Sequence, residues 1–142
     1  MTNKTSFCNC LYYSSNALAR IVTKMAEEEF SAVNLAPSYA FVVMSVNLNP
    51  GIMAGKLAEI MMLTPSTVTR LLEKLENKQL VKKINEGRST MVYPTPQSVE
   101  LNEAIQAAWY KLYQRYSFLL GEENARQLTE NIFQSARKLD NK

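Results

Sequence analysis

The residue types best suited to contact a charged ligand gather between Thr64 and Lys74. Apolar residues recur there at helical spacing, and Thr64-Pro65 is a typical helix start, so we expect a helix over roughly Pro65–Asn77. The opposite face of this helix carries short hydroxyls and long cations, namely Ser66, Thr67, Thr69, Arg70 and Lys74. Such side chains hydrogen-bond phosphate oxygens and base edges. The segment is therefore a candidate nucleic-acid-binding surface.

The positive charge of the chain is concentrated around this helix. The 142 residues carry a formal net charge of +3, and residues 1–55 and 96–142 are each neutral overall. Residues 56–95 hold seven basic and four acidic side chains and therefore carry the whole excess. A local basic excess is typical of a phosphate-binding segment, although an excess of three can also be a solvated face.

Apolar periodicity predicts the elements that precede this helix. We expect an amphipathic helix from Leu11 to about Phe30, and an almost wholly apolar, buried helix over Pro37–Leu48. A short third helix is expected over about Met53–Met62. Its buried side should present Leu57, Ile60 and Met61.

A β-hairpin and two long helices are expected after it. Residues 80–84 and 90–93 alternate loosely and flank Asn85–Ser89, a glycine-containing loop with Arg88 at its tip. Thr95-Pro96 begins a helix to about Leu120, and a final helix follows Gly121. The apolar stripes of these helices should include Leu119 and Ile132. The long helices carry more apolar face than a small domain needs, which predicts a homodimer.

The predicted fold class is mainly α with a small β-hairpin wing (α+β), a winged helix-turn-helix flanked by N- and C-terminal dimerisation helices. The length suits a single domain over residues 1–142. Within it we expect a DNA-binding lobe at residues 37–95 and helical dimerisation arms at 1–36 and 96–142.

Several runs in the lobe form a combined pattern. They are Lys56-Leu57-Ala58-Glu59, the run from Thr64 to Leu75, Leu80-Val81, and Glu86-Gly87-Arg88 before Tyr93-Pro94-Thr95. In this combination they resemble the MarR transcriptional regulators, and the flanking helices extend the resemblance to nearly the whole chain.

The resemblance implies a homodimeric transcriptional repressor that binds double-stranded DNA and is released by an effector. Its fourth helix would enter the major groove and its wing the neighbouring minor groove, on a pseudopalindromic operator with half-sites about one helical turn apart. Matching positions assign DNA contact to eight residues, Lys56, Thr64, Ser66, Thr67, Thr69, Arg70, Lys74 and Arg88.

The chain departs from the family pattern at several positions. Gln79 stands where the family usually has Gly, Glu86 stands where it has Asp, and Gly87 replaces a second wing arginine. A wing with one fewer cation should bind DNA more weakly. Met53 also precedes the third helix without the usual Ser, Thr or Asp cap.

Two cysteines, Cys8 and Cys10, stand at the start of the first helix and leave three interpretations open. They can be unremarkable cytosolic thiols, or half of a soft-metal site that a dimer completes. The stretch Cys8–Ser15 is also similar to the peroxide-sensing OhrR branch, with its reactive thiol at Cys8. A helix N-terminus lowers a thiol pKa, and the thiolate is the species that an oxidant attacks.

Aromatic residues suggest an effector site, again through the resemblance. Family members commonly bind small aromatic or phenolic effectors between the dimer helices and the DNA-binding lobe, which places Tyr12, Tyr39 and Trp109 at such a pocket. From spacing alone, the cluster of Trp109, Tyr110, Tyr113 and Tyr116 is more typical of a core or a dimer interface.

Other function classes have little support in the sequence. Histidine is absent, and no Gly-rich phosphate loop or activated nucleophile is present, so we expect no enzyme, no catalytic residue, no cofactor and no metal site. The longest apolar run, Ala40–Met44, is far shorter than a membrane span, which predicts a cytoplasmic protein without membrane contact. A winged helix that binds only other proteins remains the alternative to DNA binding.

Overall fold

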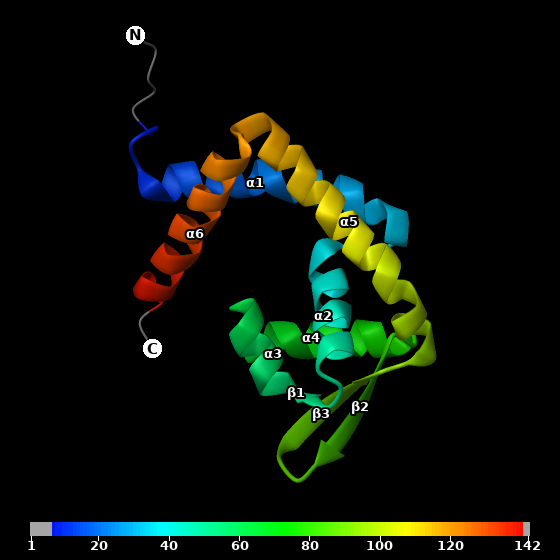
Figure 1. The fold of residues 1–142 in the computed structure, drawn as a ribbon. Helices are drawn as coiled ribbons and strands as arrows, with labels where there is room; N and C mark the ends of the chain where they lie inside the picture. Colours follow the sequence, from blue (N-terminus) through cyan, green and yellow to red (C-terminus); the bar gives the residue numbers. More distant parts are fainter. Residues whose placement is uncertain (1–6, 141–142) are drawn as a thin grey trace.

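The computed structural model describes residues 7–140 as helices around a small sheet. Figure 1 shows long helices above a lobe that ends in a hairpin. In chain order the elements are α1 (Leu11–Phe30), η1 (Ser31–Val33), α2 (Pro37–Leu48), β1 (Ile52–Met53), α3 (Ala54–Met61), α4 (Pro65–Asn77), β2 (Val81–Glu86), β3 (Ser89–Pro94), α5 (Pro96–Leu120) and α6 (Glu122–Leu139).

A continuous core joins the lobe to the arms, and α2 lies at its centre. Its residues are buried almost all round, as the apolar composition predicts, and it contacts α1, α4, α5 and β3. Phe30 of α1, Leu57 of α3, Leu75 of α4 and Ile105 of α5 are all fully buried in the same cluster. The position of the lobe is therefore set by packing shared with α1 and α5.

The structure confirms the predicted bounds of α4 and its start signal. The side-chain oxygen of Thr64 accepts a hydrogen bond from the backbone N–H of Thr67, and Pro65 is the first helical residue. Val68, Leu72 and Leu75 are buried. The preceding α3 differs from expectation on one point, because Ile60 is 49% exposed. Ala58 is buried in α3 in place of Ile60.

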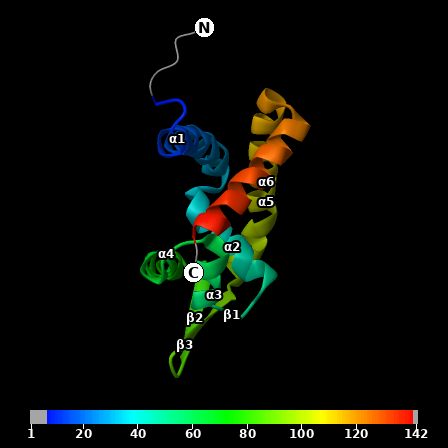
Figure 2. The same ribbon diagram turned by 90° about the vertical axis from the view of Figure 1, so that its left-hand side faces the viewer.

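The hairpin is longer and its turn tighter than the sequence predicts. The expected loop at 85–89 is largely strand, because Asn85 pairs with Thr90 and Glu86 with Ser89, which leaves a turn at Gly87 and Arg88. A third strand, β1, was not expected, and it pairs with β3 to give the antiparallel order β1-β3-β2. The hairpin projects from the lobe on the side away from the arms (Figures 1 and 2).

The arms consist of α1, α5 and α6, and an ion-pair cluster fastens α5 to α1. Arg115 donates hydrogen bonds to Glu28 and Glu29, each at 3.0 Å. The two carboxylates, Glu28 foremost, raise the pKa of Arg115 above its ordinary value. Leu119 is 72% exposed and Ile132 is also exposed, so the apolar stripes of α5 and α6 are only partly covered within the single chain.

No single helix within residues 7–140 is long and apolar enough to cross a bilayer. One pair of helices, Leu11–Val33 and Pro37–Leu48, reaches the necessary length and apolar composition together, but the pair is bent by 61°.

The end of α4 has a backbone conformation at position 79 that suits glycine. Gln79 has a φ of +62°, and hydrogen bonds from Gln79 N to Glu76 O and from Leu80 N to Leu75 O, both 2.9 Å, close the helix. A left-handed residue ends many helices in this way and is usually glycine, because other residues adopt this conformation at a cost.

We expect Gln79→Gly to stabilise the fold by about 0.5–1 kcal/mol, because relief of the left-handed strain exceeds the added entropy of the unfolded chain. Urea denaturation measures the difference. Lys78→Gly is the matched control, because Lys78 has a φ of −83° and gains nothing from glycine. Equal destabilisation by both substitutions would contradict this explanation.

Candidate nucleic-acid interface

The outer face of α4 is polar, cationic and open to solvent. Ser66, Thr69, Arg70 and Lys74 are exposed and Thr67 is half-buried. These side chains lie opposite the buried stripe that holds the helix on the lobe. Among residues 7–140, neither Arg70 nor Lys74 forms an ion pair within the chain, so both charges are available to an external anion.

Hydroxyl groups organise the first turns of α4. The Oγ1 atoms of Thr64 and Thr67 lie 2.9 Å apart, and Ser66 Oγ lies 3.2 Å from Thr64 Oγ1. Arg70 Nη2 donates to Thr67 Oγ1 at 3.5 Å, which draws the guanidinium toward the helix N-terminus. Thr69 instead donates to the backbone oxygen of Pro65. The structure thus connects four of the predicted residues, with Thr67 at the centre.

The hairpin presents a separate cation at its tip. Arg88 is exposed in the turn after Gly87, whose φ of +59° suits glycine. Thr90 donates to the side-chain oxygen of Asn85 at 2.8 Å across the strands, which braces the hairpin just below the turn. The tip can therefore carry Arg88 away from the lobe as a preformed unit.

Among the predicted cations of the part of the chain that the structure describes, only Lys56 forms an ion pair within the chain. It lies on α3 and forms an exposed ion pair with Glu59 at 3.2 Å. Such a pair is weak in water, so a phosphate can compete for the lysine. Sequence reasoning did not single out Lys78 and Lys82, two further exposed cations next to α4 and on β2, although both contribute to the charge excess.

The two cysteines are exposed and free at the entrance to α1. Cys10 directly precedes the helix, and Cys8 lies two residues earlier, where its backbone oxygen accepts a hydrogen bond from Ser14 at 3.0 Å. In the part of the chain that the structure describes, no group of three or more potential ligand side chains could hold a metal ion. Tyr39 packs against the core.

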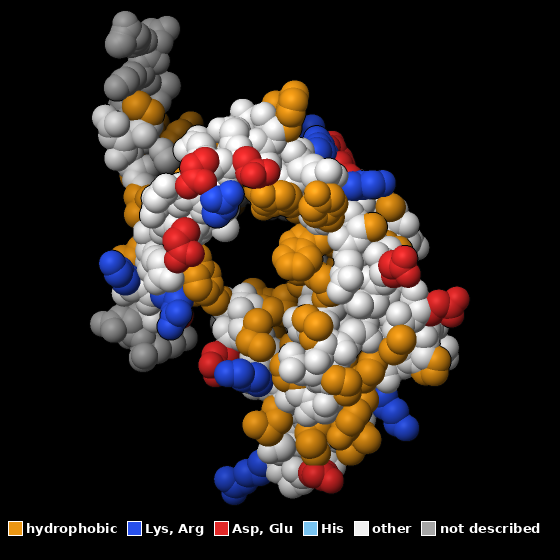
Figure 3. Space-filling model, viewed as in Figure 1, with side chains coloured by type: hydrophobic (Ala, Val, Ile, Leu, Met, Phe, Trp, Pro, Cys, Tyr) orange, Lys and Arg blue, Asp and Glu red, His pale blue; other side chains and the backbone are white. Residues whose placement is uncertain are grey.

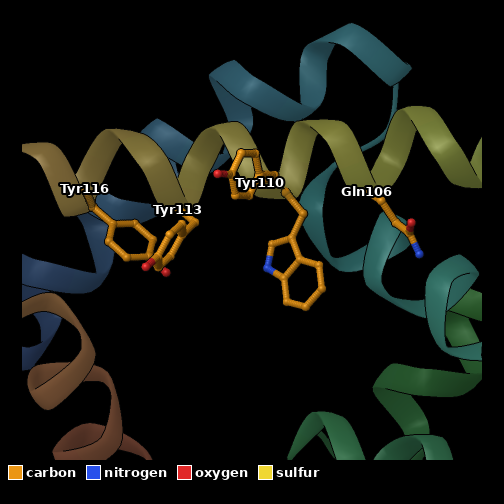
Figure 4. A pocket seen from close by; sticks show the side chains of 5 residues that line it. Gln106, Tyr110, Tyr113 and Tyr116 are labelled. Carbon is orange, nitrogen blue, oxygen red and sulfur yellow. The ribbon is translucent and has the colours of Figure 1, made fainter. Parts of the chain in front are cut away.

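Aromatic side chains line a hollow of about 240 Å³ beside α5. Its lining residues are Gln106, Trp109, Tyr110, Tyr113 and Tyr116. Figure 4 shows Tyr113 and Tyr116 on one side of the helix, and their rings meet edge to face at 5.8 Å. Burial and the neighbouring Tyr113 raise the pKa of Tyr116. The phenol of Tyr116, neutral at pH 7 even with its ordinary pKa, therefore stays protonated to a higher pH than a free tyrosine.

The hollow contains Trp109, as the sequence predicted for an effector pocket, but not the other two candidates. Tyr12 is 78% exposed near the start of α1, and Tyr39 lies against the core. Tyr12, Tyr39 and Trp109 therefore do not together line the hollow beside α5. Figure 3 shows hydrophobic side chains around the opening that the arms and the lobe enclose.

Comparison with known proteins gives a family match and close structural relatives. Residues 37–86 match the model of the MarR family. The transcriptional repressor CouR bound to p-coumaroyl-CoA has a TM-score of 0.84 at 18% identity, with 96% of this chain and 99% of that chain covered. The PcaV regulator from Streptomyces coelicolor in complex with its natural ligand has a TM-score of 0.83 at 16% identity, with 96% and 98% covered.

A third relative is a complex with nucleic acid. The S. aureus MepR–DNA complex has a TM-score of 0.78 at 19% identity, with 91% of this chain and 97% of that chain covered. No curated protein sequence matches the chain.

The structural relatives establish the fold, and the family match covers the lobe. The matched residues 37–86 run from the start of α2 to the end of β2, and they include the whole of α4. Residues 37–86 thus match the MarR family model, and the fold of the chain, both arms included, is similar to that of a solved MarR protein from Peptoclostridium difficile and of the transcriptional repressor CouR.

Proposed function

We propose that the protein is a repressor that binds a pseudopalindromic operator as a homodimer, with α4 in the major groove and the hairpin tip in the adjacent minor groove. The observation that carries the proposal is the outer face of α4, where Ser66, Thr67 and Arg70 stand opposite the buried stripe. A helix in the major groove reads base edges and phosphates with such side chains.

The dimensions and charges of the lobe support this docking. A helix of 13 residues is about 20 Å long and fits lengthwise in a major groove about 12 Å wide. An arginine at a hairpin tip, such as Arg88, suits the strongly negative potential of a narrow minor groove. MepR from S. aureus, which has the same fold, forms a complex with DNA.

Exposed apolar side chains on the arms support the homodimer. They include Ile21 on α1, Phe118 and Leu119 on α5, and Phe133 on α6. Exposed large apolar side chains on three helices are typical of an interface, and a second copy would cover them symmetrically. Repression is supported by CouR, which is described as a transcriptional repressor.

We expect Arg70→Ala to weaken binding about tenfold to a duplex that the wild-type protein selects from a random library. If Arg70 contacts phosphate, the salt dependence should flatten by about one unit, whereas loss of a base contact should relax sequence preference. Fluorescence anisotropy at two salt concentrations measures both effects, and sedimentation should show two chains per duplex.

The matched control for this experiment is Arg126→Ala on α6, which removes the same charge from an ion pair with Glu122 and Glu123. It should leave the affinity unchanged. Equal losses in both variants would exclude the outer face of α4 as the interface. A wild-type protein that selects no duplex would favour the protein-binding alternative.

The hollow beside α5 is proposed as the site of a small aromatic effector. Its walls are aromatic, with Trp109 edge to face against Phe41 of α2 at 6.0 Å and Tyr110 stacked near Tyr113 at 6.1 Å. Flat rings pack well against such walls, and tyrosine hydroxyls can bond a phenol. Trp109 also contacts Phe41 of α2, which packs at the centre of the core. An effector bound beside Trp109 could therefore shift α2 and, with it, the lobe. CouR and PcaV are each described with a bound small molecule.

Trp109 is the only tryptophan in the chain, so intrinsic fluorescence reports directly on this hollow. Saturable quenching by a hydroxybenzoate or a hydroxycinnamate is expected, together with release of DNA. Tyr113→Ala should weaken effector binding about tenfold, whereas Tyr113→Phe, which keeps the ring, should retain most of the affinity. Saturable binding without any fluorescence change would place the effector elsewhere.

Thiol-based sensing is a second proposal, favoured by the exposure of Cys8 and Cys10 at the entrance to α1. An oxidant can reach both sulfurs without any opening of the fold. Oxidation to a sulfenic acid followed by condensation with a thiol would alter the arm that α1 contributes.

If this proposal holds, organic hydroperoxide will release the protein from DNA, and Cys8→Ser will abolish the response while reduced binding stays unchanged. Cys10→Ser is the matched control and should keep at least part of the response. A Cys8→Ser protein that still leaves DNA after peroxide treatment would rule out Cys8 as the sensor.

A further inference from the structure

We propose that Glu76 is a positioning residue for DNA binding, which sets the angle between the recognition helix α4 and the hairpin. The inference rests on the proposed docking of both elements in adjacent grooves. Glu76 stands in the last turn of α4, and its carboxylate holds strand β2 at two points. Oε2 accepts a hydrogen bond from the backbone N–H of Lys83 at 3.2 Å, and Oε1 lies 3.7 Å from Lys83 Nζ.

Lys83 is the last residue of β2 that is partly buried. It pairs with Val92 of β3, which is fully buried, whereas residues 84–89 beyond this pair are exposed. The strand order places β2 at the edge of the sheet, with β3 on one side only. Glu76 therefore supplies the bond that the free edge of β2 lacks, at the point where the projecting part of the hairpin begins.

Because the hairpin projects far beyond Lys83, a small tilt at this attachment moves Arg88 by a large distance. Arg88 lies five residues beyond Lys83, which at about 3.3 Å per residue is a lever of roughly 17 Å. A tilt of about 10° at Lys83 would move the tip by roughly 3 Å, half the width of a minor groove of about 6 Å. A small change at Glu76 would thus keep Arg88 from entering the minor groove while α4 lies in the major groove.

Neither helix stability nor overall charge explains an acidic residue at this position. A carboxylate near a helix C-terminus interacts unfavourably with the helix dipole. It also adds negative charge next to a surface that we propose approaches phosphates. The Lys83 contact is the compensating interaction that the structure shows, since the side chains of Lys83 and Glu76 are only 23% and 42% exposed.

The test compares two duplexes of equal length, one selected by the wild-type protein and one of random sequence. Glu76→Ala should bind the random duplex about twofold more tightly, because a negative charge is lost, yet bind the selected duplex about tenfold more weakly. Glu76→Gln keeps an oxygen for the Lys83 N–H and should retain most of the selectivity. The melting temperature of Glu76→Ala should equal or exceed that of the wild type.

Glu73→Ala is the matched control, because Glu73 is exposed on the same helix and forms no ion pair or side-chain hydrogen bond among residues 7–140. It should bind both duplexes slightly more tightly. Equal ratios of selected to random affinity in Glu76→Ala and Glu73→Ala would overturn the positioning role.

A second measurement uses the wing itself. Arg88→Ala should cost the wild-type protein about tenfold on the selected duplex but cost Glu76→Ala at most about twofold, because the displaced tip has already lost its contact. Equal losses in the two backgrounds would also overturn the role. A wild-type protein that selects no duplex would instead overturn the DNA-binding function on which the role depends.

Discussion

Burial of the apolar stripe of α4 determines which side of this helix faces solvent, and the candidate interface depends on that choice. Val68, Leu72 and Leu75 enter a core shared with α2 and α3, and Leu75 is fully buried. A helix held in this way cannot rotate without exposing three large side chains, each worth about 1.5–3 kcal/mol of burial. The hydroxyls and cations on the opposite side are therefore kept outward by the core.

The same core links this outward face to the rest of the chain. The largely buried α2 contacts α4 below and α5 above, and α5 is fastened to α1 by Arg115 and its two glutamates. Thr95 adds a direct link, because its hydroxyl donates to the backbone oxygen of Gln79 at 2.8 Å and accepts from Ser98 N at the start of α5. A displacement of α5 would therefore also move the C-terminal end of α4.

Sequence reasoning recovered the elements whose signals are local. The bounds of α1 and α4, and the starts of α2 and α5, follow from apolar periodicity and from proline after a capping position. The hairpin turn was placed too broadly, because Asn85, Glu86 and Ser89 are polar residues without a strand pattern. The two-residue strand β1 is too short for any periodicity to appear.

Relations between distant residues were beyond sequence reasoning. Tyr12 and Tyr39 were grouped with Trp109 by resemblance, but only Trp109 reaches the hollow beside α5. The Glu76–Lys83 attachment joins a helix to a strand edge, and its significance depends on the register that places Lys83 opposite buried Val92. The departure at Gln79 was visible in the sequence, although its meaning required the φ of +62°.

Methylation interference on a duplex selected by the protein tests the central claim most directly, because methylated guanine N7 blocks the major groove and methylated adenine N3 blocks the minor groove. The account predicts guanine signals in two half-sites about one helical turn apart, flanked by adenine signals that disappear with Arg88→Ala. Interference confined to one groove, or a pattern unchanged by the loss of Arg88, would contradict docking through α4 and the hairpin tip.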